Sequence, residues 1–138
     1  MKIFVTGGTG FIGSHFVKNA IEKGFSLNCL RRIGSKPSIE IKKKPRWIYG
    51  NYDIEDYNIF KGCDSLVHIA SHSTNYPYDT LENCLMYNVT KPLEFLQKAK
   101  KSGIKNFIII GSGFEYGMSG EKFKFIPTDA PLIPKMTY

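Results

Sequence analysis

A glycine-rich turn close to the start of the chain limits the folds open to it more than any other feature. It reads TGGTGFIG over residues 6–13, with Gly7, Gly10 and Gly13 at intervals of three. A short apolar run precedes it, and apolar residues recur at helical spacing over 11–23. In such a strand–turn–helix unit the first glycine permits the tight turn, the second lets backbone approach a pyrophosphate, and the third lets the helix pack closely. The first helical amides then face the phosphates, so the unit predicts a dinucleotide site.

Strand-like and helix-like segments alternate along the chain. The runs at 65–70 and 106–110 are largely apolar, which is typical of parallel strands buried on both faces. Pro92 lies inside the longer helical segment and is expected to kink or split it. We predict a doubly wound α/β domain, a Rossmann fold truncated after strand five, with a parallel sheet in the order 3-2-1-4-5. The predicted strands are 2–6, 26–30, 47–49, 65–70 and 106–110, the predicted helices are 11–23 and 80–101, and the residues after 111 are predicted to be loop.

Size and composition indicate one globular domain over residues 1–138. Hydrophobic residues make up 42% and charged residues 22% of the chain, which are ordinary globular values. No run of about eighteen apolar residues predicts a membrane span, and the apolar start is too short for a signal peptide, so a cytoplasmic protein is expected. Cys29, Cys63 and Cys84 fit reduced, packed thiols. They show no C-x-x-C spacing, and no metal site is expected.

The formal net charge of +7 comes largely from basic residues at 42–46 and 98–105. A basic cluster is found in nucleic-acid patches and equally in solvated loops between strands. No aromatic stacking platform is evident beside residues 42–46, so the solvated loop is favoured and no nucleic-acid or membrane partner is expected. A positive field also attracts phosphorylated ligands such as dinucleotides and nucleotide sugars.

Several segments together resemble the short-chain dehydrogenase/reductase family. TGGTGFIGS is similar to its extended branch, the NAD-dependent epimerase/dehydratase family. Asp53-Ile54 resembles a pair that touches adenine, and GCDSLVHIAS at 62–71 resembles a strand that lines the cofactor. Asn88-Val89-Thr90 and IIIGSGFEYG at 108–117 match later motifs, so the resemblance spans the chain and implies a cofactor-binding portion whose substrate domain is absent. The cofactor-binding residues it implies are Gly7, Gly10, Phe11, Ile12, Gly13, Asp53, Ile54, Ala70 and Ser71.

The end of the second strand bears on the choice between NAD and NADP. An acidic residue there would bind the ribose 2′-hydroxyl of NAD, whereas arginine accommodates the 2′-phosphate of NADP. The chain has Arg31 and Arg32 at this place and no acidic residue before Glu40. A planar guanidinium can donate two hydrogen bonds to a phosphate. NADP is therefore preferred; NAD is the alternative, in which both arginines are solvated loop residues.

The resemblance also implies two catalytic residues. It places the active-site hydroxyl at Ser112, which would hydrogen-bond the group being oxidised or reduced, and the acid/base at Tyr138. In the family a lysine four residues later lowers the pKa of that tyrosine from its usual value of about 10. The chain ends at Tyr138, so a fragment that is a poor catalyst alone is expected. In the alternative, Ser112 only satisfies backbone groups and the chain is a non-catalytic dinucleotide-binding module.

For the parent enzyme, the resemblance implies hydride transfer between C4 of a nucleotide sugar and a nicotinamide. Gly113-Phe114-Glu115 differs from the Asp-Glu pair of sugar dehydratases, so epimerisation is favoured. The runner-up is an NADPH-dependent reductase of a 4-keto sugar. Lys91-Pro92 stands where the family usually has Gly-Thr. His68 is expected to be packed, His72 is expected either to contact substrate or to be exposed, and a homodimer is a further expectation.

Overall fold

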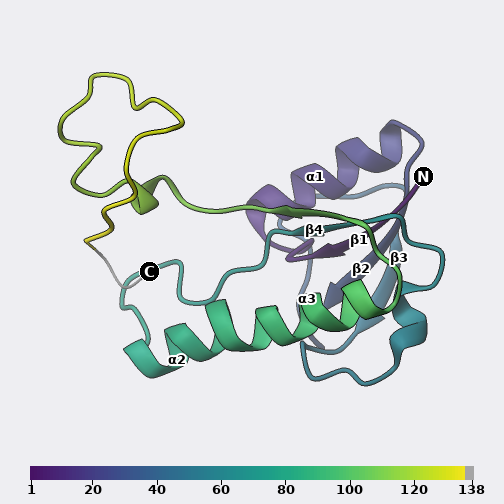
Figure 1. The fold of residues 1–138 in the computed structure, drawn as a ribbon. Helices are drawn as coiled ribbons and strands as arrows, with labels where there is room; N and C mark the ends of the chain where they lie inside the picture. Colours follow the sequence, from purple (N-terminus) through teal and green to yellow (C-terminus); the bar gives the residue numbers. More distant parts are fainter. Residues whose placement is uncertain (136–138) are drawn as a thin grey trace.

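The structure, a computed structural model, describes residues 1–135. Its five strands are parallel and form one sheet in the order β3-β2-β1-β4-β5 (Figure 1). The strand order reverses beside β1, where sheets of this kind bind ligands. The predicted fold class and strand order are therefore confirmed. The strands are β1 (Lys2–Thr6), β2 (Ser26–Arg31), β3 (Arg46–Tyr49), β4 (Ser65–His68) and β5 (Asn106–Ile109).

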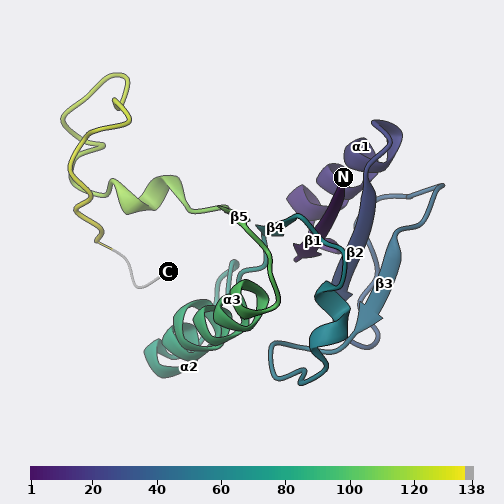
Figure 2. The ribbon, with the colours of Figure 1, turned by 45° about the vertical axis from the view of Figure 1, so that its right-hand side comes forward.

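Helices cover both faces of the sheet (Figure 2). One face packs against the first helix, and the other packs against a long helical run that begins beyond β4. Two short 3₁₀ turns are also present, and neither is predicted, because a single turn is too short to show a hydrophobic period. The helical elements are α1 (Phe11–Glu22), η1 (Tyr57–Phe60), α2 (Leu81–Leu85), the π-helical η2 (Met86–Thr90), α3 (Lys91–Lys101) and η3 (Gly113–Glu115).

Pro92 changes the winding of the long helix without dividing it in two. The residue lies in the first turn of α3, where a missing N–H costs little. The segment before it is π-helical, and the Lys91 amide donates to the Met86 carbonyl five residues back. A proline ring clashes with the carbonyl four residues before it in a regular α-helix. The predicted interruption therefore takes the form of a wider turn.

Two apolar clusters, one on each face of the sheet, make up the core. On the α3 side, Phe4, Phe60 and Phe95 pack with ring centroids 4.8, 5.3 and 5.8 Å apart. On the α1 side, Val5, Val17 and Cys29 are fully buried. All three cysteines are buried and free, as expected of packed thiols, and burial raises the pKa of Cys29 to about 12.

The prediction that residues 106–110 are buried is wrong. β4 is buried along its whole length, as predicted. Ile108 and Ile109 of β5 are instead 54% and 59% exposed, and Ile110 beyond it is 47% exposed. β5 is the outer strand and pairs only with β4 among the described residues. An apolar run predicts burial only if another element packs on it, and its composition does not say whether the strand is central or outermost.

The residues after β5 form an irregular extension that leads away from the sheet (Figures 1 and 2). Apart from η3 they form no helix or strand up to residue 135, as predicted. The extension is held by the Met118 amide donating to the Ile133 carbonyl at 3.0 Å and by an ion pair of 2.6 Å between Lys135 and Glu121. No helix in residues 1–135 has the length and apolar character needed to cross a bilayer.

Candidate functional site

The glycine turn lies where the carboxyl ends of β1 and β4 meet. Thr6, the last residue of β1, is paired with His68, the last residue of β4. Gly7 follows with a φ of +75°, and a Cβ there would lie 2.4 Å from the Ala70 amide nitrogen. Only glycine combines this left-handed backbone with so close an approach. The turn is therefore packed against the chain that leaves β4.

The start of α1 fits a diphosphate. A Cβ on Gly13 would lie 2.0 Å from the Gly7 carbonyl oxygen, so the helix packs directly on the turn. A Cβ on Gly10 would meet only that same oxygen, at 3.5 Å, and the space beside Gly10 is otherwise open. Gly10 is the N-cap of α1, and no side chain caps the helix. The first amides are therefore left for an anion at the positive end of the helix dipole.

Phe11 and Ile12 lie in the first turn of α1 with exposed side chains. They are 72% and 60% exposed, and the Phe11 ring contacts His15 edge-on at 4.9 Å. Exposed apolar side chains are ordinary on protein surfaces. Their predicted contact with the cofactor remains a prediction.

The connection from β2 to β3 is fastened to the glycine turn. The Ser38 amide donates to the Thr9 carbonyl at 3.1 Å, and its hydroxyl donates to the Gly10 carbonyl at 3.2 Å. The lysines at 42–44 are exposed, which confirms the predicted loop. Lys36 and Lys44 nevertheless line a groove of about 430 Å³ together with Trp47 and Tyr49. Aromatic surface therefore does accompany these lysines, which was not evident from the sequence.

Arg31 and Arg32 make different contacts. The Arg31 guanidinium lies over the rings of Trp47 and Tyr49, 5.0 and 5.1 Å from their centroids, and donates to the Ser35 carbonyl. Its Nε is buried without a hydrogen-bond partner, and the residue borders the groove. Arg32 is exposed, and its charge acts on the Tyr52 phenol. Of the two arginines predicted to bind the 2′-phosphate, Arg31 thus borders the groove and Arg32 does not line it.

Asp53 and Ile54, the predicted adenine pair, follow β3. Ile54 packs against the core on the α3 side. Asp53 is exposed, and its Oδ1 lies 2.5 Å from Lys91 Nζ at the start of α3. The hydrogen bond and charge of Asp53 raise the pKa of Lys91. Sequence reasoning missed this pair, although Lys91 was visible as a departure from the family pattern.

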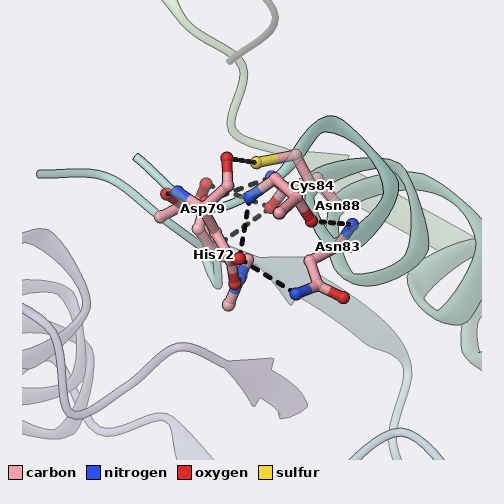
Figure 3. A network of polar contacts seen from close by, with 8 residues as sticks. His72, Asp79, Asn83, Cys84 and Asn88 are labelled. Carbon is pink, nitrogen blue, oxygen red and sulfur yellow. Dashed lines mark hydrogen bonds and ion pairs between the residues drawn. The ribbon is translucent and has the colours of Figure 1, made fainter. Parts of the chain in front are cut away.

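Asn88 fastens the chain beyond β4 to the long helix (Figure 3). Its Oδ1 accepts from the His72 amide at 2.7 Å and from the Ser71 hydroxyl at 3.3 Å. Its side-chain amide donates back to the His72 carbonyl at 3.1 Å. Ala70 is half-buried beside Gly7. Ala70 and Ser71, which are predicted to line the cofactor, thus lie on a segment held from both sides.

His72 is paired with Asp79 (Figure 3). His72 Nε2 lies 2.7 Å from Asp79 Oδ2, while Asp79 Oδ1 accepts from Asn83 at 2.9 Å and from the Thr80 amide at 2.7 Å. The hydrogen bonds from Asn83, His72 and Thr80 lower the pKa of Asp79 to about 2. His72 is partly exposed and borders a hollow of about 490 Å³. Contact of His72 with a substrate remains a prediction.

His68 is buried, as predicted. His68 and His72 stand four residues apart, a spacing that binds metals when it occurs on one face of a helix. Here His68 is the last residue of β4 and His72 lies in the loop beyond it, and their rings hydrogen-bond to Thr6 and Asp79 respectively. Residues 1–135 contain no group of three or more histidine, cysteine or acidic side chains that could hold a metal ion.

Ser112 lies just beyond β5 and caps η3. Its hydroxyl oxygen accepts from the Phe114 amide at 3.2 Å, and its own amide donates to Glu115 Oε1 at 2.7 Å. This is the backbone-satisfying role that the sequence left open beside catalysis. A hydroxyl that accepts one bond can still donate its proton, so the cap leaves the catalytic role open. Tyr138 lies outside the described residues.

Comparison with known families shows where the chain belongs. The model of the NAD dependent epimerase/dehydratase family matches residues 3–138. The chain belongs to this family. The resemblance inferred from the motifs is therefore confirmed.

Three proteins that the chain resembles are much longer than the chain itself. A Synechocystis protein provisionally named dihydroflavonol 4-reductase is 31% identical over 119 residues, which cover 86% of this chain and 34% of that protein. A Thermotoga maritima UDP-glucose 4-epimerase, solved with UDP-glucose, is 27% identical with a TM-score of 0.69. The match covers 85% of this chain and 40% of the epimerase chain. A short-chain dehydrogenase/reductase superfamily protein from Agrobacterium tumefaciens was solved with bound NAD. Its structure matches 100% of this chain and 40% of that protein, with a TM-score of 0.76 at 20% identity, which supports the fold. The chain spans less than half of each.

Proposed function

We propose that residues 1–138 bind a nicotinamide dinucleotide and form the cofactor-binding domain of an NAD(P)-dependent enzyme that acts on a nucleotide sugar. The observation that carries this proposal is the glycine turn, which offers uncapped helical amides beside β1 and β4 and leaves Gly10 open. Membership of the epimerase/dehydratase family and the relative solved with UDP-glucose support it.

The residues present fit such a cofactor at each of its parts. The turn from Gly7 to Gly13 would hold the diphosphate, with Phe11 and Ile12 at its rim. Asp53 and Ile54 would face the adenine, and Ala70 and Ser71 would line the path toward the nicotinamide. When bound, the nicotinamide supplies a hydride acceptor and donor.

For the chemistry, we favour epimerisation at C4 of the sugar. Ser112 would hydrogen-bond the C4 oxygen, and Tyr138 would take its proton as hydride leaves C4 and return the proton as hydride comes back. Removal and return of one hydride leave the sugar with no net oxidation. The segment Gly113-Phe114-Glu115 after Ser112 differs from the Asp-Glu pair that would supply the added acid and base for expulsion of water, which favours epimerisation over dehydration.

For the cofactor, we favour NADP over NAD. No acidic side chain follows β2 before Glu40. The groove beside β3 is lined by Arg31, Lys36 and Lys44, and the Nε of Arg31 has no hydrogen-bond partner among the described residues. An orphaned, buried N–H donor is costly unless a ligand or water accepts from it. A phosphate monoester meets that need.

The second candidate is an NADPH-dependent reductase of a 4-keto sugar. The two arginines after β2 favour a phosphorylated cofactor, and the Synechocystis relative carries a reductase name. Both candidates use the same dinucleotide site, so the binding experiment below tests what they share.

The test is calorimetric titration of the chain with NADP⁺ and NAD⁺. We expect binding of both, with the tighter affinity for NADP⁺. Gly13→Ala should abolish measurable binding, because its methyl group would collide with the Gly7 carbonyl. Gly113→Ala is the matched control, since it also places alanine at a glycine outside the positive-φ region, but in open space. Absence of binding by the folded wild-type chain would contradict the proposal.

The proposal includes a homodimer. Large apolar side chains along the long helix are exposed and fit an interface between copies of the protein. Analytical ultracentrifugation of the wild-type chain and of a double variant, Leu85→Glu with Leu93→Glu, tests this by comparing their masses in solution. We expect a dimer for the wild-type chain and a monomer for the variant. The exposed side chains are Leu81, Leu85, Met86, Tyr87, Val89 and Leu93.

A further inference from the structure

A buried polar cluster sits beneath the glycine turn. Thr6 Oγ1 and His68 Nδ1 lie 2.7 Å apart in a buried hydrogen bond between the last residues of β1 and β4. These residues are 1% and 6% exposed. The Tyr52 ring packs against the His68 imidazole with centroids 6.0 Å apart, and against Phe95 at 5.4 Å. The cluster is therefore part of the core on the α3 side.

The outer members of this cluster each stand directly before a segment assigned to the cofactor. Thr6 precedes Gly7 and the diphosphate turn. Tyr52 precedes Asp53 and the adenine pair. His68 contacts both outer members, and Thr6 also acts on the Tyr52 phenol through a hydrogen bond, so these three side chains link the two parts of the proposed site.

The surroundings of His68 favour its neutral form. Burial lowers the pKa of His68 from its usual 6.5. Burial raises the pKa of Tyr52 to about 12, against smaller opposing effects of Thr6 and Arg32, so the phenol stays neutral at physiological pH. Arg32 is the charged group that acts on Tyr52. The neighbour paired with His68 from β5 is Ile109, which does not titrate.

We propose that neutral His68 is a positioning residue of the dinucleotide site, which holds Thr6 and Tyr52 and so sets the distance between the diphosphate turn and the adenine pair. This inference rests on the proposed cofactor function. A protonated imidazole has no acceptor nitrogen and would place an unpaired charge in the core. The population able to bind would fall, and the apparent Kd would rise by the same factor.

The test is calorimetric titration with NAD⁺ between about pH 8 and pH 5. NAD⁺ is used because the 2′-phosphate of NADP⁺ itself titrates near pH ~6. For the wild-type chain we expect a constant Kd above the pKa of His68 and a rise of about tenfold per pH unit below it. His68→Asn places an amide near the Nδ1 position and does not titrate. It should bind within about threefold of wild type at neutral pH, with a flat profile.

Two further variants separate the hydrogen bond from the charge. His68→Phe keeps the ring packed on Tyr52 and loses the bond to Thr6, so its affinity should fall about tenfold and not vary with pH. Thr6→Val removes the same bond and keeps the imidazole, so it should be weaker with the pH dependence retained. Ser65→Ala, at the buried start of the same strand, is the control and should match the wild-type profile.

Circular dichroism at each pH restricts the comparison to folded protein. The inference is overturned if the Kd of the wild-type chain for NAD⁺ does not change with pH, or if folded His68→Asn still loses affinity in acid. Either outcome leaves the cofactor proposal unaffected. If His68→Asn does not fold, Thr6→Val decides the question. An affinity for NAD⁺ equal to that of the wild-type chain would then show that the bond between Thr6 and His68 does not position the site. No binding of NAD⁺ or NADP⁺ at any pH overturns both.

Discussion

The chain up to β4 and the chain from β5 onward differ in how fully they bury their own apolar side chains. β1, β2 and β4 are almost completely covered. In β5 and beyond, Ile108, Phe114 and Phe125 are 54%, 59% and 82% exposed. The proposed dinucleotide site thus lies on strands whose apolar side chains are buried within this chain. Ser112 lies in the region whose large apolar side chains are exposed.

The largest expected effect concerns stability in the two regions. Phe4→Ala in β1 should cost roughly 3–5 kcal/mol, because it opens a cavity among fully buried rings. Ile109→Ala in β5 should cost less than about 1 kcal/mol, because much of its side chain is already in water. Urea denaturation followed by circular dichroism measures both. Equal losses would remove the contrast between the two regions.

The next effect concerns the cofactor. Arg31→Ala should weaken NADP⁺ binding about tenfold and leave NAD⁺ binding nearly unchanged, since Arg31 borders the groove proposed for the 2′-phosphate and only NADP⁺ carries that group. Phe125→Ala, on the extension, should change neither affinity. Calorimetry with both cofactors checks this. Equal weakening of NAD⁺ and NADP⁺ would remove Arg31 from the choice of cofactor.

A smaller effect is the pH dependence of stability without ligand. The pKa of His68 is lowered in the folded chain, so the unfolded chain takes up this proton first. Stability should therefore be full above about pH 6.5 and fall as the pH drops toward the lowered pKa, by at most about 1.4 kcal/mol per pH unit for one proton. Asp79, whose pKa is lowered to about 2, contributes only below its usual 3.8. Urea midpoints of wild type and His68→Asn should converge in acid, and parallel curves would contradict this.

The smallest effect concerns the pair of Lys91 and Asp53. Both side chains are partly exposed, and exposed ion pairs are weak and screened by salt. Lys91→Ala should change NAD⁺ affinity only about twofold, because it frees the carboxylate of Asp53, which is itself a member of the adenine pair. The change should disappear at high salt. Lys105→Ala, a lysine outside the pair, serves as the control.

Local patterns in the sequence were sufficient for the long helix with its interruption and the position of the glycine turn, since these depend on the hydrophobic period, the missing N–H of Pro92 and the spacing of the glycines. Buried β4 was predicted for the same reason. These features follow from backbone geometry and burial, which nearby residues dictate. The strand order followed from the alternation of strands and helices together with the general rule of right-handed crossovers.

Contacts between distant segments were decided only by the tertiary structure. Arg31 lies over Trp47 and Tyr49, and His68 joins Thr6 to Tyr52, because adjacent strands place their side chains together. Ile108 and Ile109 of β5 are exposed because this outermost strand belongs to neither of the two apolar clusters through these side chains. A side chain's charge state, partner and exposure depend on what packs against it from elsewhere in the chain, and that information is absent from any local pattern.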